Sequence, residues 1–134
     1  KEQGDVDSAI IDAATKHLAA NNIRDQKANV TDVWNCDFDG DGKCEQLFKA
    51  EEWKENGENY CFLGYLAGEN CQILSGCCYP EYKEREPMDL YPMVCDLSGK
   101  KQWQILVYKR CEYESFSVFQ SESGNFSKNY EIIY

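Results

Sequence analysis

The chain has 134 residues and a formal net charge of −10, with eight cysteines and one histidine. This length fits one domain, residues 1–134, with a core of its own. The negative charge repels nucleic acid and anionic membranes, which excludes both as favoured partners, and it attracts divalent cations or a basic protein partner. No apolar run approaches the ~20 residues of a membrane span.

The cysteines predict disulfides in an oxidising compartment, and therefore a secreted, cell-surface or periplasmic protein. A zinc site has no supporting motif, because no C-x-x-C pair occurs and His17 is the only histidine. No signal peptide is present, so we expect a mature product in which residues 1–6 are a tether. The disulfide candidates are Cys36, Cys44, Cys61, Cys71, Cys77, Cys78, Cys95 and Cys111.

Residues 7–22 are predicted to form a helix. Ile10, Ala14 and Leu18 recur every fourth residue and make one apolar stripe. Asn21 and Asn22, at the end of the segment, favour a left-handed residue that stops the helix.

Beyond the helix the apolar period changes to two, which is typical of strands. We expect a mainly β (α+β) fold, in which the N-terminal helix is followed by an antiparallel sheet of about eight strands, because the strands are closely spaced without helical crossovers. The expected strands lie near residues 30–36, 45–50, 59–66, 71–74, 93–95, 103–109, 115–120 and 130–133.

A shift of the chain against itself by 59 residues predicts a duplicated β unit. Segment 36–48, CDFDGDGKCEQLF, then aligns without a gap on segment 95–107, CDLSGKKQWQILV. The alternative is that any hairpin with a Cys-Asp corner has this appearance. The predicted organisation is a first β unit at 28–74, a connecting excursion at 75–92 and a second β unit at 93–134.

The excursion at 75–92 holds all three prolines, which oppose regular structure and favour a stiff, exposed segment. Aromatic residues interleave with charges there, and ordered loops of this kind are common recognition sites. A plain connector held down by the adjacent Cys77 and Cys78 is the alternative. The interaction candidates are Tyr79, Tyr82, Met88, Leu90 and Tyr91.

Residues 37–45, DFDGDGKCE, predict a calcium site. Calcium takes six to eight oxygen ligands, which alternating aspartates supply if glycines absorb the backbone angles between them. An EF-hand is excluded because its glutamate at position twelve is Phe48 here, and magnesium is disfavoured because it dehydrates reluctantly. The alternative is a turn whose charges only face water. The candidate ligands are the side chains of Asp37, Asp39, Asp41 and Glu45 and the carbonyl of Lys43.

This pattern, D-x-D-G-D-G-x-x-E between two strands, resembles the calcium loops of FG-GAP and integrin-α β-propeller repeats and of similar hairpins in exported bacterial proteins. The resemblance implies a structural ion between two antiparallel strands. It is strong for this hairpin and weak for the unit at 93–109, and two units cannot close a propeller. In the second copy, Ser98, Lys100 and Gln104 replace acidic ligands, so we expect no ion there.

The disulfide pairing is open, because eight cysteines permit 105 connectivities. Cys36 and Cys44 bracket the loop and are one expected pair. Cys61 and Cys71 flank the next hairpin turn and are another. The other four cysteines then tie the excursion to the second unit.

No catalytic motif is present, neither G-x-S-x-G nor H-E-x-x-H nor a glycine-rich phosphate loop, so we do not expect an enzyme. The favoured hypothesis is an exported, disulfide-rich, calcium-stabilised, non-catalytic protein-binding module, of the surface-recognition, inhibitor or immunity type. The alternative is a calcium-dependent hydrolase of extracellular glycans or phosphoesters, which requires open coordination positions on the ion and a nearby base.

Overall fold

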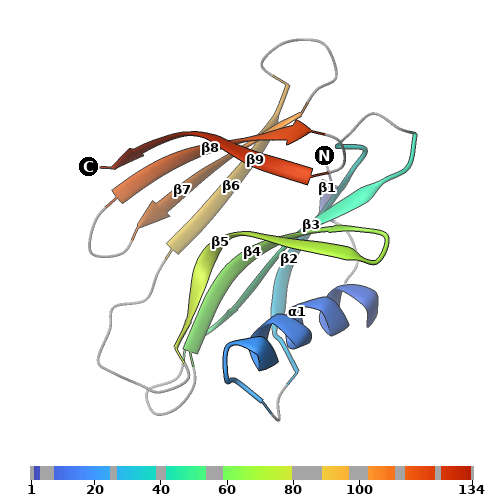
Figure 1. Ribbon diagram of the computed structural model, residues 1–134, viewed down its shortest axis with the longest axis vertical. Helices are drawn as coiled ribbons and strands as arrows, with labels where there is room; N and C mark the ends of the chain where they lie inside the picture. Colours follow the sequence, from blue (N-terminus) through green and yellow to red (C-terminus); the bar gives the residue numbers. More distant parts are fainter. Residues whose placement is uncertain are drawn as a thin grey trace.

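The computed structural model describes residues 2–3, 8–24, 27–38, 42–53, 59–79, 89–96, 103–110, 114–122 and 125–133. Within these ranges the protein has one helix and nine strands in two antiparallel sheets, which confirms the predicted mainly β (α+β) fold. Figure 1 shows three layers: the second sheet at the top, the first sheet in the middle and the helix at the bottom. The described part of the chain contains no helix long and apolar enough to cross a membrane.

The strands follow the chain in two groups. The first sheet has the order β1-β2-β3-β4-β5 and the second the order β6-β7-β8-β9. The elements are β1 (Glu2–Gln3), α1 (Ser8–Ala20), β2 (Val30–Cys36), β3 (Glu45–Glu52), β4 (Asn59–Ala67), β5 (Asn70–Tyr79), β6 (Asp89–Cys95), β7 (Gln104–Arg110), β8 (Glu114–Glu122) and β9 (Asn125–Ile133).

Helix α1 covers one face of the first sheet with its predicted stripe. Ile10, Ala14 and Leu18 are fully buried, in one core cluster with Phe48 and other residues of the sheet. The helix is shorter than the predicted 7–22, and the left-handed stop is confirmed, since the φ of Asn22 is 68°.

The opposite face of the first sheet packs against the second sheet. Leu63 and Tyr65 of β4 meet Ile105 and Phe119 in this inter-sheet core. Since the first sheet is covered on both sides, β4 is buried from Asn59 to Leu66 rather than at alternate positions.

A side chain also joins the edges of the two sheets. The Gln72 amide on β5 donates to the backbone oxygen of Phe126 on β9 at 2.6 Å, and its oxygen accepts from the Phe126 N–H at 2.9 Å. Both backbone groups of an edge-strand residue are thereby satisfied across the sheets.

Several predicted boundaries differ from the observed elements. Strand β1 lies within the predicted tether 1–6, where it pairs with β2. The predicted excursion 75–92 is narrower, because β5 continues to Tyr79 and β6 begins at Asp89. Pro92 belongs to β6, which is an edge strand and can therefore contain a residue that lacks an N–H. Residues 80–88 lie outside the described residues.

The two sheets repeat one another in strand order, in agreement with the predicted shift of 59. Adding 59 to the bounds of β2 gives the bounds of β6, and each strand starts a four-stranded meander. The register pairs Cys36 with Glu45 in the first sheet and Cys95 with Gln104 in the second. The aligned sequence positions therefore occupy the same place in the two ladders.

Candidate functional site

The loop between β2 and β3, here called the aspartate loop (residues 37–45), is fixed at both ends by its own carboxylates. Asp37 Oδ2 accepts a hydrogen bond from the Gly42 N–H at 2.8 Å, across the loop. Glu45 Oε1 accepts one from the Phe38 N–H at 2.9 Å. Gly42 has a φ of +89°, a conformation that favours glycine and lets the chain turn back toward Asp37.

Glu45 is a buried acid. Only 4% of its surface is exposed, although it lies next to the exposed Cys44. Moving a carboxylate out of water is costly unless hydrogen bonds or a positive charge compensate. The Phe38 N–H supplies one such hydrogen bond, and a cation in the loop would supply a charge.

Two carboxylates lie at the two ends of the aspartate loop. Asp37 and Glu45 contribute carboxylate oxygens from opposite ends of one loop, and hard cations prefer oxygen ligands. Lys43 is exposed on the described part of the loop. Asp39 and Asp41 lie outside the described residues, and among the described ones no group of three or more metal-binding side chains occurs.

In the second sheet, Gln104 occupies the position that Glu45 occupies in the first, so an amide replaces the carboxylate there. Gln104 is 6% exposed, and its Nε2 donates to Gln120 Oε1 at 2.8 Å. A neutral side chain can satisfy its polar atoms with a neighbouring strand and needs no ion. Ser98 and Lys100 lie outside the described residues.

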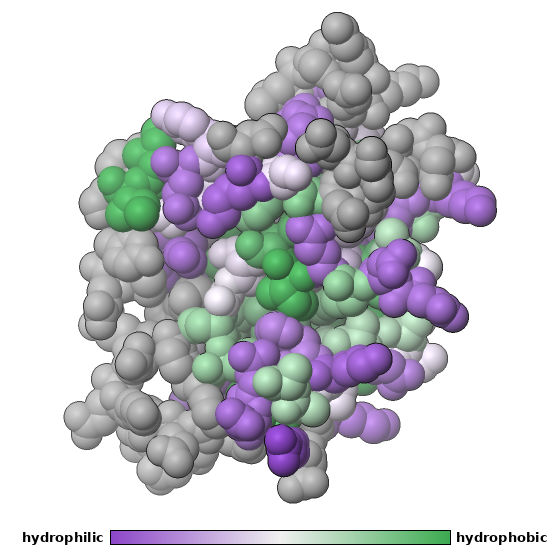
Figure 2. All heavy atoms as spheres, viewed as in Figure 1, coloured by the Kyte–Doolittle hydropathy of each residue, from purple (hydrophilic) through white to green (hydrophobic). Residues whose placement is uncertain are grey.

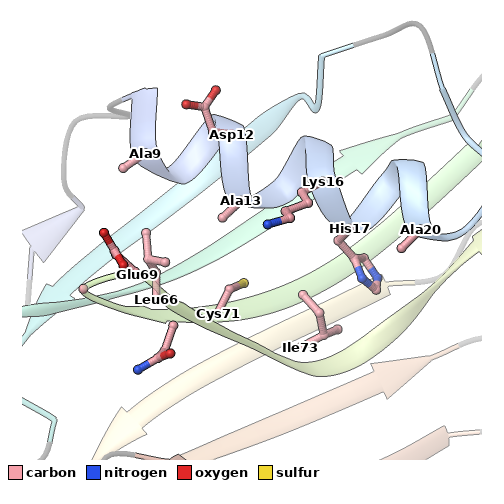
Figure 3. A pocket seen from close by; sticks show the side chains of 12 residues that line it. Ala9, Asp12, Ala13, Lys16, His17, Ala20, Leu66, Glu69, Cys71 and Ile73 are labelled. Atoms are coloured by element: carbon pink, nitrogen blue, oxygen red, sulfur yellow. The ribbon is translucent and has the colours of Figure 1, made fainter.

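A groove of about 620 Å³ lies between helix α1 and the β4–β5 hairpin. Its apolar floor includes Leu66 and Ile73, and Figure 2 shows a hydrophobic area at this level of the molecule, over β5. In Figure 3 the helix lies along one wall of the groove. Lys16 and His17 are on its right-hand half, toward Ala20, and Cys71 lies below its middle.

Two of the side chains that line the groove have shifted pKa values. Cys71 is exposed at the surface, and partial burial of its thiol raises the pKa, which favours the protonated form over the reactive thiolate. Burial lowers the pKa of His17, whose ring packs edge-on to Phe62 with 4.6 Å between the ring centres. His17 is therefore half-buried and packed on the core.

The second sheet carries the exposed large hydrophobic side chains Tyr91, Met93, Phe116, Tyr130 and Ile133. Residues directly opposite one another in an antiparallel ladder share a face. The register defines two complete rows across β6, β7, β8 and β9. The first row is Tyr91, Tyr108, Phe116 and Ile132, and the second is Met93, Leu106, Val118 and Tyr130.

None of these eight residues, here called the outer face, is buried. Tyr91 is 55% exposed, Met93 63% and Tyr130 58%. Tyr91 stacks on Tyr108 at 5.9 Å between ring centres, and Tyr108 contacts Phe116 at 5.0 Å. Neither row contains a charge, and an exposed ion pair between Arg110 and Asp89, at 2.8 Å, lies beyond the first row.

The sequence located only part of this surface. Tyr91 was an interaction candidate and lies on the outer face. Leu90 was another and is fully buried, because alternate residues of β6 point into the inter-sheet core, so it cannot contact a partner there. Of the remaining candidates, Tyr79 ends β5 but its side chain is not described, and Tyr82 and Met88 lie outside the described residues.

The rest of the outer face was missed for a definite reason. In β7 both faces are apolar, since Ile105 and Val107 point inward while Leu106 and Tyr108 point outward. A continuous apolar run does not reveal which residues face the core. Only the register of the folded sheet separates the two sets.

The ladders also place the cysteines. Cys36 lies opposite Glu45, the neighbour of Cys44, so these two candidates are close in the structure. Cys61 lies directly opposite Cys77, whereas Cys71 lies opposite Leu66. Cys78 is on the helix-facing side, opposite Tyr60. Cys95 is the last residue of β6. Cys111 lies outside the described residues.

Comparisons of the chain with models of protein families, with curated proteins and with solved structures found no match.

Proposed function

We propose that this chain is an exported, non-catalytic protein-binding module, of the surface-recognition, inhibitor or immunity type, that contacts its partner with the outer face. The observation that supports the proposal is the pair of apolar rows across four strands, with Met93 63% and Tyr91 55% exposed. Contiguous exposed apolar patches mark interaction sites more often than isolated apolar residues do. Tyrosine and methionine are also enriched in protein interfaces.

The size of the outer face suits the centre of an interface. Strands lie about 4.8 Å apart and same-face residues about 6.8 Å apart along a strand, so two rows over four strands cover roughly 300 Å². A stable interface buries about 800 Å² on each partner. Polar residues around the outer face would therefore have to contribute the rim.

Charge favours a basic partner over a second copy of this chain. With a net charge of −10, two copies repel each other, whereas a basic protein is attracted. The predicted partner is accordingly a basic protein with an apolar contact surface. Electrostatic attraction of this kind mainly raises the rate of association, and the apolar rows supply contact energy.

Calcium has a structural role in the proposal. The side chains of Asp37, Asp39, Asp41 and Glu45 and the carbonyl of Lys43 are the proposed ligands. The ion would neutralise carboxylates that otherwise repel one another within nine residues, so its binding would be coupled to folding of the loop. Disulfides in an oxidising compartment are the second proposed source of stability.

Site-specific photo-crosslinking tests the binding surface. A photoreactive residue is placed at Met93 on the outer face and, as the control, at Ala20 on helix α1, which is also exposed. Both proteins are exposed to extracellular proteins of the source at millimolar calcium. We expect a basic protein to be captured at Met93 only, and the purified partner to bind Met93→Ala at least tenfold more weakly than Ala20→Ser, as measured by calorimetry.

Three results would contradict the proposal. Equal capture at both positions would show that the outer face is not selective. Crosslinks between two copies at Met93 would indicate self-association instead. Calcium-dependent hydrolysis of glycan or phosphoester substrates, with no captured protein, would favour the hydrolase alternative.

A further inference from the structure

We propose that Cys61 of β4 and Cys77 of β5 form a cross-strand disulfide. The register makes them direct Cα partners. Opposite residues of an antiparallel pair have Cα atoms about 4.5 or 5.5 Å apart, and disulfides span Cα separations of about 4.4 to 6.8 Å. Their side chains also share one face of the sheet, the face toward the inter-sheet core.

Gly76, next to Cys77 in β5, approaches the backbone of β4 too closely to carry a Cβ atom. A Cβ atom on Gly76 would collide with the carbonyl oxygen of Cys61 and with the Cα of Phe62. The φ of Gly76 is +124°, which side chains with a Cβ rarely adopt. Glycine at this position therefore permits the close approach that brings Cys77 against Cys61.

Neighbouring cysteines are poorly placed to compete. Cys71 lies opposite Leu66, five residues along β4 from Cys61, which is a distance of roughly 17 Å along a strand. Cys78 lies opposite Tyr60 and packs into the other core, on the helix side. The pair Cys61 and Cys71 that the sequence favoured is therefore wrong in this fold.

Burial determines when the bond forms. Cys61 is fully buried, and burial together with the Glu51 carboxylate raises the pKa of its thiol. Exchange requires a thiolate and access for the oxidant, so the bond forms while the sheets are apart and is then protected. Each thiol loses one electron and one proton, and a disulfide oxidant such as oxidised glutathione is reduced to two thiols.

Peptide mapping of the full-length oxidised chain tests the pair. The protein is refolded in a glutathione redox buffer, alkylated without reduction and cleaved after Glu69 and after Leu74, which separates Cys61, Cys71 and the adjacent Cys77 and Cys78 into different peptides. The Cys78→Ser variant then leaves Cys77 as the only cysteine of its peptide. We expect the Cys61 and Cys77 peptides to be linked, with a mass two hydrogens below their sum.

Two variants complete the test. Cys61→Ala should leave Cys77 open to alkylation, while the matched control Cys71→Ala should keep the link. A link from Cys61 to Cys71 or Cys78, or full alkylation of Cys61 in the oxidised wild-type protein, would overturn the pairing. Mapping of the wild-type chain needs no variant to fold. The bond in the cell depends on the oxidising compartment of the proposed function, but this in vitro result does not depend on any partner.

Discussion

Glu45 and Phe38 connect the aspartate loop to the core. The Glu45 carboxylate accepts the Phe38 N–H at 2.9 Å, and the Phe38 ring is fully buried against Tyr65 and Phe126, at 5.7 and 5.8 Å between ring centres. Phe126 belongs to the second sheet, so one residue of the loop contacts both sheets. Order in the loop is thereby coupled to closure of the inter-sheet core.

The first prediction is that calcium raises the melting temperature. At a calcium concentration one hundred times the dissociation constant, binding to the folded state alone adds about 2.7 kcal/mol. For a domain of this size that corresponds to a rise on the order of 10 °C. Differential scanning fluorimetry at millimolar calcium and with excess chelator measures the shift.

Two variants test whether the rise in melting temperature with calcium comes from the aspartate loop. Glu45→Gln keeps the size of the buried side chain but removes its charge, so the calcium shift should be lost. Asp12→Asn removes an acid from helix α1, away from the loop, and should keep the full shift. An unchanged melting temperature of the wild-type protein with and without calcium would contradict the ligand assignment.

The second prediction concerns the Phe38 ring. Phe38→Ala removes a fully buried aromatic side chain and should lower the free energy of unfolding by about 3 to 5 kcal/mol. Urea unfolding measures this change. Phe38→Leu retains most of the apolar volume and should cost less than half as much; an equal loss from both variants would show that the ring contacts themselves, rather than the filled volume, hold the loop.

Local patterns predicted the helix and most strands well. The stripe of Ile10, Ala14 and Leu18 identified the buried side of α1, and the bounds of β2 agree with the expected strand at residues 30–36. These elements have a clean period and clear stop signals. Their faces follow directly from the sequence.

Strands β5, β6 and β9 extend well beyond their expected ranges. A register irregularity skips Leu74, and the positive φ of Gly76 follows, so the apolar alternation of β5 breaks in its middle. The start of β6 was predicted to belong to the excursion, because Pro92 opposes regular structure. The outer face and the Cys61 and Cys77 pair both depend on register, which is a property of strand pairs and is not visible in any single segment.

The third prediction is a pH dependence from His17. Burial lowers its pKa below the usual 6.5, so the unfolded chain binds a proton more readily than the folded one. The contribution of the neutral His17 ring to the free energy of unfolding is therefore fully present above about pH 6.5. It decreases as the pH falls toward the pKa that His17 has in the folded protein. Because His17 is the only histidine, His17→Gln should reduce the slope of melting temperature between pH 7.5 and 5.5.

A matched variant on the same helix controls for that slope. Lys16→Gln also changes one charged group beside the groove, but lysine does not titrate in this interval. Its melting curve should follow the wild-type slope. A His17→Gln protein with the full wild-type slope would mean that other groups cause the pH dependence.

The fourth prediction separates the two faces of β6. Leu90 and Met93 lie in one strand but differ in exposure, at 0% and 63%. Leu90→Ala should lower the free energy of unfolding by about 2 to 5 kcal/mol, because it opens a cavity between the sheets. Met93→Ala should change it by no more than about 0.5 kcal/mol, since the side chain is largely in water. Urea unfolding measures both, and retention on a hydrophobic column should fall for Met93→Ala alone. A loss of stability from Met93→Ala comparable with that from Leu90→Ala would mean that the outer face is covered within this chain, which would remove it as a binding surface.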